Sequence, residues 1–343
     1  MVDMAKALLL LSGGLDSTLA GRLLLGLGVQ VEAVNFTSPF CRCTPKSLGC
    51  SAARKAADQL GIPVRVFGTG ADYLEMVKHP RFPRGSGVNP CIDCRIMIFS
   101  RAGRHMAEVG ADFIATGEVL GERPMSQRLE AMRLIERESG LAGKVLRPLS
   151  ARLLEPSEPE KSGLVDRSRL LSIQGRSRQP QIQLARELGI TDYLCPAGGC
   201  LLTDKEFAAR FRDMMEHEPG FGLREARLLS VGRHFRIPSG SKVIVGRNQE
   251  ENQAMAAAQA AGEALVAPAV VPGPSALCRP ESAETAAALV AAYTEGGMTI
   301  DVVVRGSAGG VCQMASVQPA LRASAAAWRV GSRPPAGGGP DGD

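Results

Sequence analysis

The chain has 343 residues, 45% of them hydrophobic, which is enough apolar material for two or three compact domains. Only 4% of the residues are aromatic, so a broad stacking platform for bases is not expected, and the net charge of +5 is compatible with a polyanionic partner. The nine cysteines fall mostly in close clusters and do not resemble a disulfide framework, which indicates a reducing, cytoplasmic location. The apolar run at residues 7–11 is too short to span a bilayer, so no membrane partner is expected.

Strands and helices alternate along the first part of the chain. Short apolar runs that end near glycine or proline predict strands, and longer amphipathic runs predict helices. The predicted strands cover residues 7–11, 29–36, 64–67 and 112–116, and the predicted helices cover residues 17–25, 52–60 and 96–109. This alternation favours an α/β fold, a doubly wound parallel sheet whose ligands lie at the carboxyl ends of the strands.

The pattern changes after residue 150, so residues 1–150 are expected to form the first domain. Residues 151–220 are interpreted as a connector and a subdomain that carries cysteines and arginines, with a helix at 181–188. A smaller α+β domain is predicted over residues 226–332, with strands at 228–231, 233–237, 242–245 and 299–304 and a helix at 248–262. Residues 333–343 form a proline- and glycine-rich tail that is expected to be disordered.

The segment Ser12-Gly13-Gly14-Leu15-Asp16-Ser17 connects the first predicted strand to the first predicted helix. Its two glycines, Gly13 and Gly14, let backbone amides turn toward an anion, and the helix N-terminus adds a positive dipole. Ser12 and Ser17 are predicted to hydrogen-bond phosphoryl oxygens, and Asp16 to hold a magnesium ion that bridges the phosphates. A glycine pair alone is more often a plain strand-to-helix connection, so the prediction depends on the whole hexapeptide.

This hexapeptide resembles the signature of the PP-loop ATP pyrophosphatases, which have an adenine nucleotide α-hydrolase-like fold, cleave ATP between its α- and β-phosphates and adenylate a carbonyl oxygen. The resemblance implies ATP and Mg2+ as cofactors and Asp16 as a catalytic residue. It also implies that Asn35 and Phe36 line the adenine pocket and that Gly117 approaches the nucleotide. The alternative for these three positions is an ordinary strand end. The absence of a Lys-Ser/Thr pair from this loop excludes a P-loop kinase fold.

Cys91 and Cys94 form a CxxC pair at the start of a predicted helix, whose N-terminus is expected to lower the pKa values of both thiols. The surrounding segment 89–95 resembles the Asn-Pro-x-x-x-Cys motif of the tRNA 2-thiouridylases, and the CxxC resembles that of the iron-sulfur tRNA thiolation enzymes. In the latter, a distant third cysteine completes the ligation of a [4Fe-4S] cluster, which implies Cys200, or alternatively Cys195, here. Structural zinc and a redox pair that delivers persulfide sulfur are the other interpretations.

The remaining cysteines are less informative. Cys41, Cys43 and Cys50 follow the second predicted strand, where they either hold a metal, relay sulfur or are buried or tolerated thiols. Cys278 and Cys312 are isolated and are interpreted as structural.

Several arginines are candidate contacts for RNA. Arg123 follows the nucleotide-facing strand, in reach of ATP or an RNA backbone, and Arg176 and Arg178 flank a serine next to a glycine, a pattern that fits phosphate groups. Residues 236–252 resemble the RNA-binding domain of the NFACT family, which makes Arg247 a further RNA-binding candidate. Solvated charges are the alternative for the arginines, and an inert domain for packing or homodimer formation is the alternative for the last domain.

The motifs together resemble the tRNA thiolation branch of the PP-loop family, with 4-thiouridine synthases and 2-thiouridylases as members. This resemblance implies an ATP-dependent tRNA sulfurtransferase that adenylates the C2 or C4 oxygen of a uridine, releases pyrophosphate and transfers sulfur from sulfide or a persulfide carrier. One alternative is amidation or nitrile formation on a small molecule, as in the 7-cyano-7-deazaguanine synthases. The other is a non-catalytic RNA-binding protein.

Overall fold

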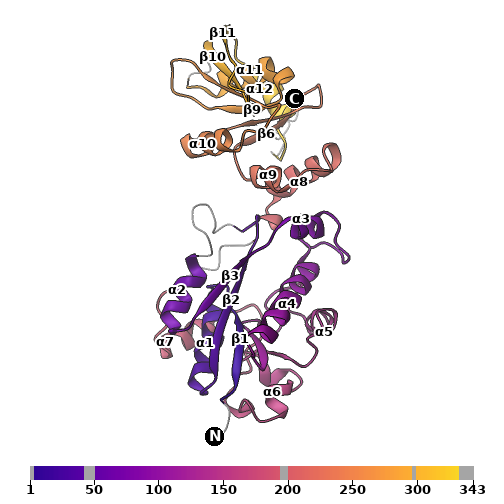
Figure 1. Ribbon diagram of the computed structural model, residues 1–343, viewed down its shortest axis with the longest axis vertical. Coiled ribbons are helices and arrows are strands. Elements are labelled where there is room, and N and C mark those ends of the chain that lie inside the picture. Colours follow the sequence, from indigo (N-terminus) through magenta and orange to yellow (C-terminus); the bar gives the residue numbers. More distant parts are fainter. Residues whose placement is uncertain (1–3, 42–50, 194–199, 296–298, 332–343) are drawn as a thin grey trace, which may run out of the picture. The chain divides into compact units, whose positions relative to one another are not determined.

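The computed structural model describes residues 4–41, 51–193, 200–295 and 299–331 (Figure 1). The chain divides into two compact units, Met1–Leu201 and Leu202–Asp343. The finer division predicted from the sequence, with limits at residues 150 and 220, stays a prediction. The expected tail at residues 333–343 lies outside the described residues.

Five parallel strands form the sheet of the first unit, in the order β3-β2-β1-β4-β5. They are β1 Lys6–Leu10, β2 Gln30–Thr37, β3 Val64–Gly68, β4 Phe113–Thr116 and β5 Val145–Leu146. Strands β2 and β3 lie on one side of β1, whereas β4 and β5 lie on the other, so the winding direction reverses between β1 and β4. Sheets of this kind bind ligands at that reversal, beyond the carboxyl ends of the strands.

Helices cover both faces of this sheet (Figure 1). They are α1 Leu15–Gly26, α2 Ser51–Leu60, α3 Ala71–Lys78, α4 Cys91–Glu108, α5 Leu129–Glu138, α6 Glu158–Lys161 and α7 Gln179–Glu187, with short 3-10 helices η1 Ala151–Leu153 and η2 Arg167–Arg169. On β1, Ala7 and Leu9 pack with residues of α1 and α2, while Leu8 packs with residues of α4 and α5. Because β1 is buried on both faces, its sequence is a continuous apolar run.

The second unit contains a six-stranded antiparallel sheet in the order β11-β10-β8-β9-β7-β6. Its strands are β6 Arg233–Arg236, β7 Lys242–Val245, β8 Ala264–Pro268, β9 Ala276–Cys278, β10 Ile300–Gly306 and β11 Val311–Val317. Its helices are α8 Lys205–His217, α9 Leu223–Leu228, α10 Gln249–Ala258, α11 Ala283–Tyr293 and α12 Arg322–Trp328; 3-10 helices lie at η3 Leu201–Thr203 and η4 Pro280–Ser282. The apolar face of α11 packs on β7, β8, β9 and β10 to make the core.

The predicted fold class, a doubly wound parallel sheet followed by a smaller α+β unit, is confirmed. The predicted strand at residues 228–231 is wrong, because Leu228 ends α9 and the residues after it form turns. A short apolar run fits a buried helix end as well as a strand, so periodicity alone does not separate the two. Within the described residues, no helix has both the length and the apolar character that a bilayer crossing requires.

Candidate active site

The predicted phosphate loop connects β1 to α1 and is held by hydrogen bonds within itself. The hydroxyl oxygens of Ser12 and Ser17 lie 3.0 Å apart, and the Ser12 amide donates to Ser17 Oγ at 3.2 Å. The Thr18 hydroxyl donates to the Gly14 carbonyl at 3.0 Å. Gly14 is the N-cap of α1 and supplies no side-chain cap, so the amides of the first turn are available to an anion.

Two glycines bring other segments against this loop. Gly13 has a φ of +80°, and a Cβ there would lie 2.6 Å from the carbonyl oxygen of Ala52 in α2. Gly117 follows β4, and a Cβ there would lie 2.6 Å from the Asp16 carbonyl oxygen and closer still to the Ser17 amide nitrogen. Because a side chain would displace the first turn of α1, the approach of β4 to the phosphate loop requires glycine at position 117.

The two residues expected in the adenine pocket face opposite sides of the sheet. Asn35 is buried and donates from Nδ2 to the Leu11 carbonyl at 2.8 Å, so it reaches the start of the phosphate loop. The Phe36 ring instead stacks on Phe67 at a centroid distance of 5.5 Å and lines a hollow with residues of α4. The structure therefore joins Asn35, and not the Phe36 ring, to the loop; an adenine contact by either residue stays a prediction.

Asp16 lies in a half-buried cluster of opposite charges at the start of α1. Arg178 Nη2, from the residue before α7, is 3.4 Å from Asp16 Oδ2. Burial raises the pKa of the Asp16 carboxyl above its ordinary value, and the guanidinium groups of Arg178 and Arg123 oppose that rise. Burial and the Asp16 carboxylate also raise the pKa of Glu122. Two of the three arginines expected to contact phosphate in the first unit thus lie at the phosphate loop itself.

Replacing Asp16 with asparagine is expected to stabilise the ligand-free protein above the acidic range, because burial penalises the ionised carboxylate. Between the ordinary aspartate pKa of 3.8 and the raised value, the folded chain binds more protons than the unfolded chain. The contribution of Asp16 to stability therefore falls as the pH rises through that window. Urea unfolding at a series of pH values should show the advantage of Asp16→Asn growing with pH and then levelling.

The control is Asp58→Asn, which changes an exposed aspartate of α2. This variant should track the wild type at every pH. An Asp16→Asn advantage that shrinks as the pH rises would contradict the inferred penalty.

A buried ion network fixes the first turn of α4 against the end of β4. Glu118 accepts a hydrogen bond from Arg147 Nε at 3.0 Å and pairs with Arg95 Nε at 3.5 Å. Arg147 also pairs with Glu136 of α5. Burial alone would lower the pKa of Arg147, but the two carboxylates outweigh it and raise that pKa. Because Arg95 follows Cys94, this network positions the CxxC pair beside the strand end that carries Gly117.

A cysteine cluster surrounds the buried side chain of Tyr73 in α3, which is only 3% exposed. The Tyr73 hydroxyl and Cys94 Sγ are hydrogen-bonded at 3.2 Å. Burial and then the thiols of Cys94, Cys200 and Cys41 raise the pKa of Tyr73 well above its ordinary value, which places all three sulfurs near the phenol. The Leu201 amide donates to the carbonyl of Phe40 at 3.2 Å, so the segments that carry Cys200 and Cys41 are joined.

The expected lowering of the thiol pKa values is wrong. Burial raises the pKa of Cys94, and the Tyr73 hydroxyl and Arg95 only oppose the rise. Burial also raises the pKa of Cys91, against Arg95, the Asn89 amide and Arg123. Removing a thiolate from water disfavours ionisation at both positions.

The expected metal ligands Cys91, Cys94 and Cys200 do not form a closed ligand group. Among the residues that the structure describes, no three His, Cys, Asp or Glu side chains are arranged to hold a metal ion. Cys43, Cys50 and Cys195 lie outside the described residues. Thiols are suitable donors for an iron-sulfur cluster, but the arrangement described here does not fit one.

The other two predicted RNA contacts are Arg176 in the first unit and Arg247 in the second unit. Arg176 is exposed on the surface of the first unit. Arg247, at the start of α10, is ion-paired with Glu251, and its Nε donates to Glu251 Oε1 at 2.9 Å. The neighbouring residues of its motif have structural roles: Asn248 caps α10, and the Asn252 side chain accepts a hydrogen bond from the Ser275 amide at 2.9 Å.

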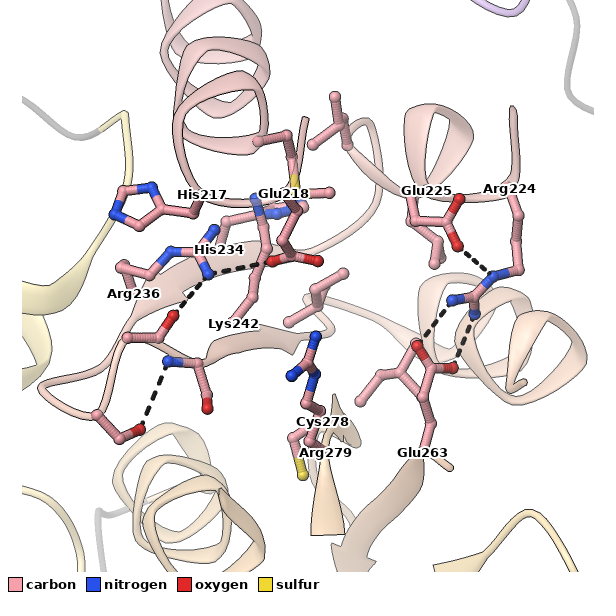
Figure 2. Close-up of a pocket in the computed structure, with 18 residues that line it drawn as sticks. His217, Glu218, Arg224, Glu225, His234, Arg236, Lys242, Glu263, Cys278 and Arg279 are labelled. Atoms are coloured by element: carbon pink, nitrogen blue, oxygen red, sulfur yellow. Dashed lines mark hydrogen bonds and ion pairs between the residues drawn. The ribbon is translucent and has the colours of Figure 1, made fainter. Parts of the chain in front are cut away.

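The second unit has a pocket of about 240 Å3 between α8, α9 and the sheet (Figure 2). Most charges that line it are paired: Arg236 with Glu218 at 3.1 Å, and Arg224 with Glu263 at 2.7 Å. Arg279 also lines the pocket, and no hydrogen bond or ion pair of its side chain is present among the described residues. The pocket therefore has a mixed polar character and is not a bare basic surface.

Three residues of the first-unit site were not predicted from the sequence: Tyr73, Gln181 and Glu118. Tyr73 lies outside every motif, and only its burial next to cysteines marks it. Gln181 lies fully buried in the first turn of α7, beside Asp16. The one local signal that could have identified Glu118 is its position directly after the strand-end glycine.

Two family models match separate parts of the chain. Residues 5–133 match the tRNA methyl transferase HUP domain, and residues 232–329 match the NFACT protein RNA binding domain. These matches confirm the two resemblances expected from the hexapeptide and from residues 236–252. The HUP match ends within α5, so it contains the phosphate loop and the CxxC pair.

Curated relatives match part of the chain. A protein of Syntrophotalea carbinolica named tRNA-specific 2-thiouridylase MnmA is 39% identical over 119 residues, which are 32% of this chain and 33% of the relative. A protein of Staphylococcus aureus named probable tRNA sulfurtransferase is 34% identical over 149 residues, 42% of this chain and 34% of the relative. The chain thus spans about a third of the length of the curated relatives it matches.

Solved structures give a weaker likeness. A 4-thiouridine synthetase in complex with RNA and ATP is 26% identical, with a TM-score of 0.33 over 54% of this chain and 52% of that one. The U34-tRNA thiolase NcsA of Methanococcus maripaludis, solved with its [4Fe-4S] cluster, is 18% identical, with a TM-score of 0.33 over 66% of this chain and 72% of that one. Both scores are low, so the fold assignment rests on the strand order of the sheet.

Proposed function

We propose that this chain, which joins a HUP domain to an NFACT RNA-binding domain, is an enzyme that thiolates a tRNA uridine at the expense of ATP. One observation carries the proposal: the end of β4 contacts both halves of the site. A Cβ at Gly117 would lie 2.6 Å from the Asp16 carbonyl oxygen, and the next residue, Glu118, pairs at 3.5 Å with Arg95, which follows Cys94. The end of β4 therefore lies beside the group expected to handle ATP and beside the helix start expected to handle sulfur. This supports one continuous site for activation and sulfur transfer.

In the activation step, the loop amides and the hydroxyls of Ser12 and Ser17 bind the phosphates of ATP. Asp16 would hold the magnesium ion, which offsets the phosphate charge. A carbonyl oxygen of the uracil attacks the α-phosphorus, the bond to the bridging oxygen breaks, and pyrophosphate leaves. The AMP now attached to that oxygen makes it a good leaving group.

In the sulfur step, Cys94 carries a persulfide loaded by a sulfur donor, and the terminal sulfur attacks the activated carbon as AMP leaves with the original oxygen. The Cys200 thiolate then attacks Cys94 Sγ, which releases the thiouridine and leaves a Cys94–Cys200 disulfide. A thiol reductant supplies two electrons and resets the pair. The position of both sulfurs near Tyr73 supports this assignment.

A [4Fe-4S] cluster held by Cys91, Cys94 and Cys200 would supply an open iron site for sulfide. The described residues contain no such ligand group, so the proposed steps use cysteine sulfur alone.

The second unit is proposed to bind the tRNA, on the basis of the family match over residues 232–329. Arg279 lines the pocket of Figure 2, and among the described residues no ion pair neutralises its charge. It is therefore the first residue of that unit to test for a phosphate contact.

The experiment incubates the protein with unmodified tRNA, MgATP, a persulfide donor and dithiothreitol. Nucleoside mass spectrometry should detect a thiolated uridine, and AMP and pyrophosphate should form in equal amounts with it. AMP formation that depends on a small carboxylate or amine instead of tRNA would favour the amidating enzymes. Binding of tRNA without any use of ATP would favour a non-catalytic RNA-binding protein.

A further inference from the structure

Arg178 is held at the phosphate loop by a segment from late in the first unit. It is the residue before α7, and α7 packs on α1 through a shared apolar cluster. The Gly175 amide donates to the Leu120 carbonyl at 2.7 Å, and Gln174 forms a parallel bridge with Leu120. The segment after β4 therefore holds the backbone of residues 174 and 175 in place, just before Arg178 in the chain. The main-chain contacts of the fold thus position this arginine next to Asp16.

The contact between Arg178 and Asp16 leaves polar atoms unsatisfied. The pair is long, at 3.4 Å, and Asp16 Oδ1 and Arg178 Nε are both buried without a hydrogen-bond partner. The Gln181 side chain is fully buried beside Asp16. Neither its amide nitrogen Nε2 nor its amide oxygen Oε1 has a hydrogen-bond partner. Buried polar groups in folded proteins are nearly always paired, so a cluster of unpaired ones at a phosphate loop points to a ligand that completes it.

We propose that Arg178 joins the phosphate loop in binding the β- and γ-phosphates of ATP and the departing pyrophosphate, and that Asp16 holds Arg178 in place while the site is empty. This inference rests on the proposed use of ATP. The planar guanidinium forms paired hydrogen bonds with phosphoryl oxygens, which carry more negative charge than a single carboxylate. When Arg178 moves to the phosphates, the Asp16 carboxylate becomes available to the magnesium ion that accompanies ATP.

The surroundings of Arg178 favour the nucleotide over the RNA backbone. Its side chain is 20% exposed and faces the 19% exposed carboxylate of Asp16, and Arg123 adds a second positive charge there. Arg176, two residues earlier, is exposed and is better placed for a long polyanion. The two arginines, which the sequence presents as one motif, are thus assigned to different ligands.

The test is calorimetric titration of the full-length protein with ATP, with pyrophosphate and with AMP, each in the presence of magnesium. Arg178→Ala should weaken the binding of ATP and of pyrophosphate about tenfold to hundredfold, the loss expected for a hydrogen-bonded charge pair. The affinity for AMP should stay unchanged, because AMP lacks the β- and γ-phosphates. Arg178→Lys should recover part of the lost affinity, since it restores the charge without the planar geometry.

The matched control is Arg186→Ala, which removes an exposed arginine from the same helix and should bind all three ligands as the wild type does. Wild-type affinity of Arg178→Ala for ATP and pyrophosphate, together with weaker binding of tRNA, would overturn the inference and make Arg178 an RNA contact. An equal loss for AMP would overturn it as well, by indicating general damage to the loop. Failure of the wild-type protein to bind ATP would instead overturn the proposed function, and this inference with it.

Discussion

Replacement of Cys94 by serine is expected to abolish tRNA thiolation, by at least about 1,000-fold, while activation by ATP survives for one turnover. Serine retains a hydroxyl that can hydrogen-bond the Tyr73 phenol, as Cys94 Sγ does at 3.2 Å, so the surrounding packing should be preserved. A hydroxyl cannot carry a persulfide, however, and the adenylated tRNA would have no sulfur to receive. Quenched-flow measurements should detect about one equivalent of pyrophosphate per protein and no thiolated uridine.

The matched control is Cys312→Ser, which changes an exposed thiol of β11 in the second unit and should thiolate tRNA at the wild-type rate. Full thiolation by Cys94→Ser would contradict the role given to Cys94. If anaerobically purified wild type contained iron and acid-labile sulfide that Cys94→Ala lost, a cluster would replace the persulfide as the sulfur carrier.

Replacement of Gly117 by alanine is expected to lower the rate of ATP-dependent activation about 100-fold, the effect of a displacement near 1 Å at a reacting centre. The added Cβ would lie 2.6 Å from the Asp16 carbonyl oxygen, so either β4 or the first turn of α1 must move. Both carry groups that the proposed reaction uses. Pyrophosphate release measured at several ATP concentrations would separate weaker binding from slower chemistry.

Gly26→Ala is the control for the chemical change itself. Gly26 is the last residue of α1, and apart from its chain neighbours and the backbone of its own helix no atom lies within 4 Å of a Cβ placed there. This variant should keep its activity, because alanine is a better helix former than glycine and meets no neighbour. Unchanged activity in Gly117→Ala would mean that the close approach of β4 to α1 is not needed for ATP use.

The sequence predicted the core of the first unit well because its signals are local. The apolar run of β1, the glycine pair after it and the amphipathic stretch of α1 are contiguous, and each reports on burial or backbone conformation at its own position. The HUP match over residues 5–133 agrees with this part of the prediction. In the second unit, short apolar segments gave weaker signals, and the strand predicted at residues 228–231 is the end of a helix.

The electrostatic predictions succeeded less well, because charge effects depend on burial. A CxxC pair at a helix start suggested thiols with lowered pKa values, whereas burial raises the pKa values of Cys91 and Cys94. Arg176 and Arg178 look equivalent in the sequence. The fold exposes the first and turns the second toward Asp16.

The sequence by itself determined the parallel sheet, the glycine-rich loop between β1 and α1 and the presence of a CxxC pair, since each depends on neighbouring residues. Only the tertiary structure decided which distant groups meet them: Arg178 at Asp16, and Tyr73 among the sulfurs of Cys94, Cys200 and Cys41. These groups come from segments separated by many residues, and the packing of α7 on α1 and of α3 beside α4 brings them together. Such contacts follow from the global fold, which no local pattern encodes.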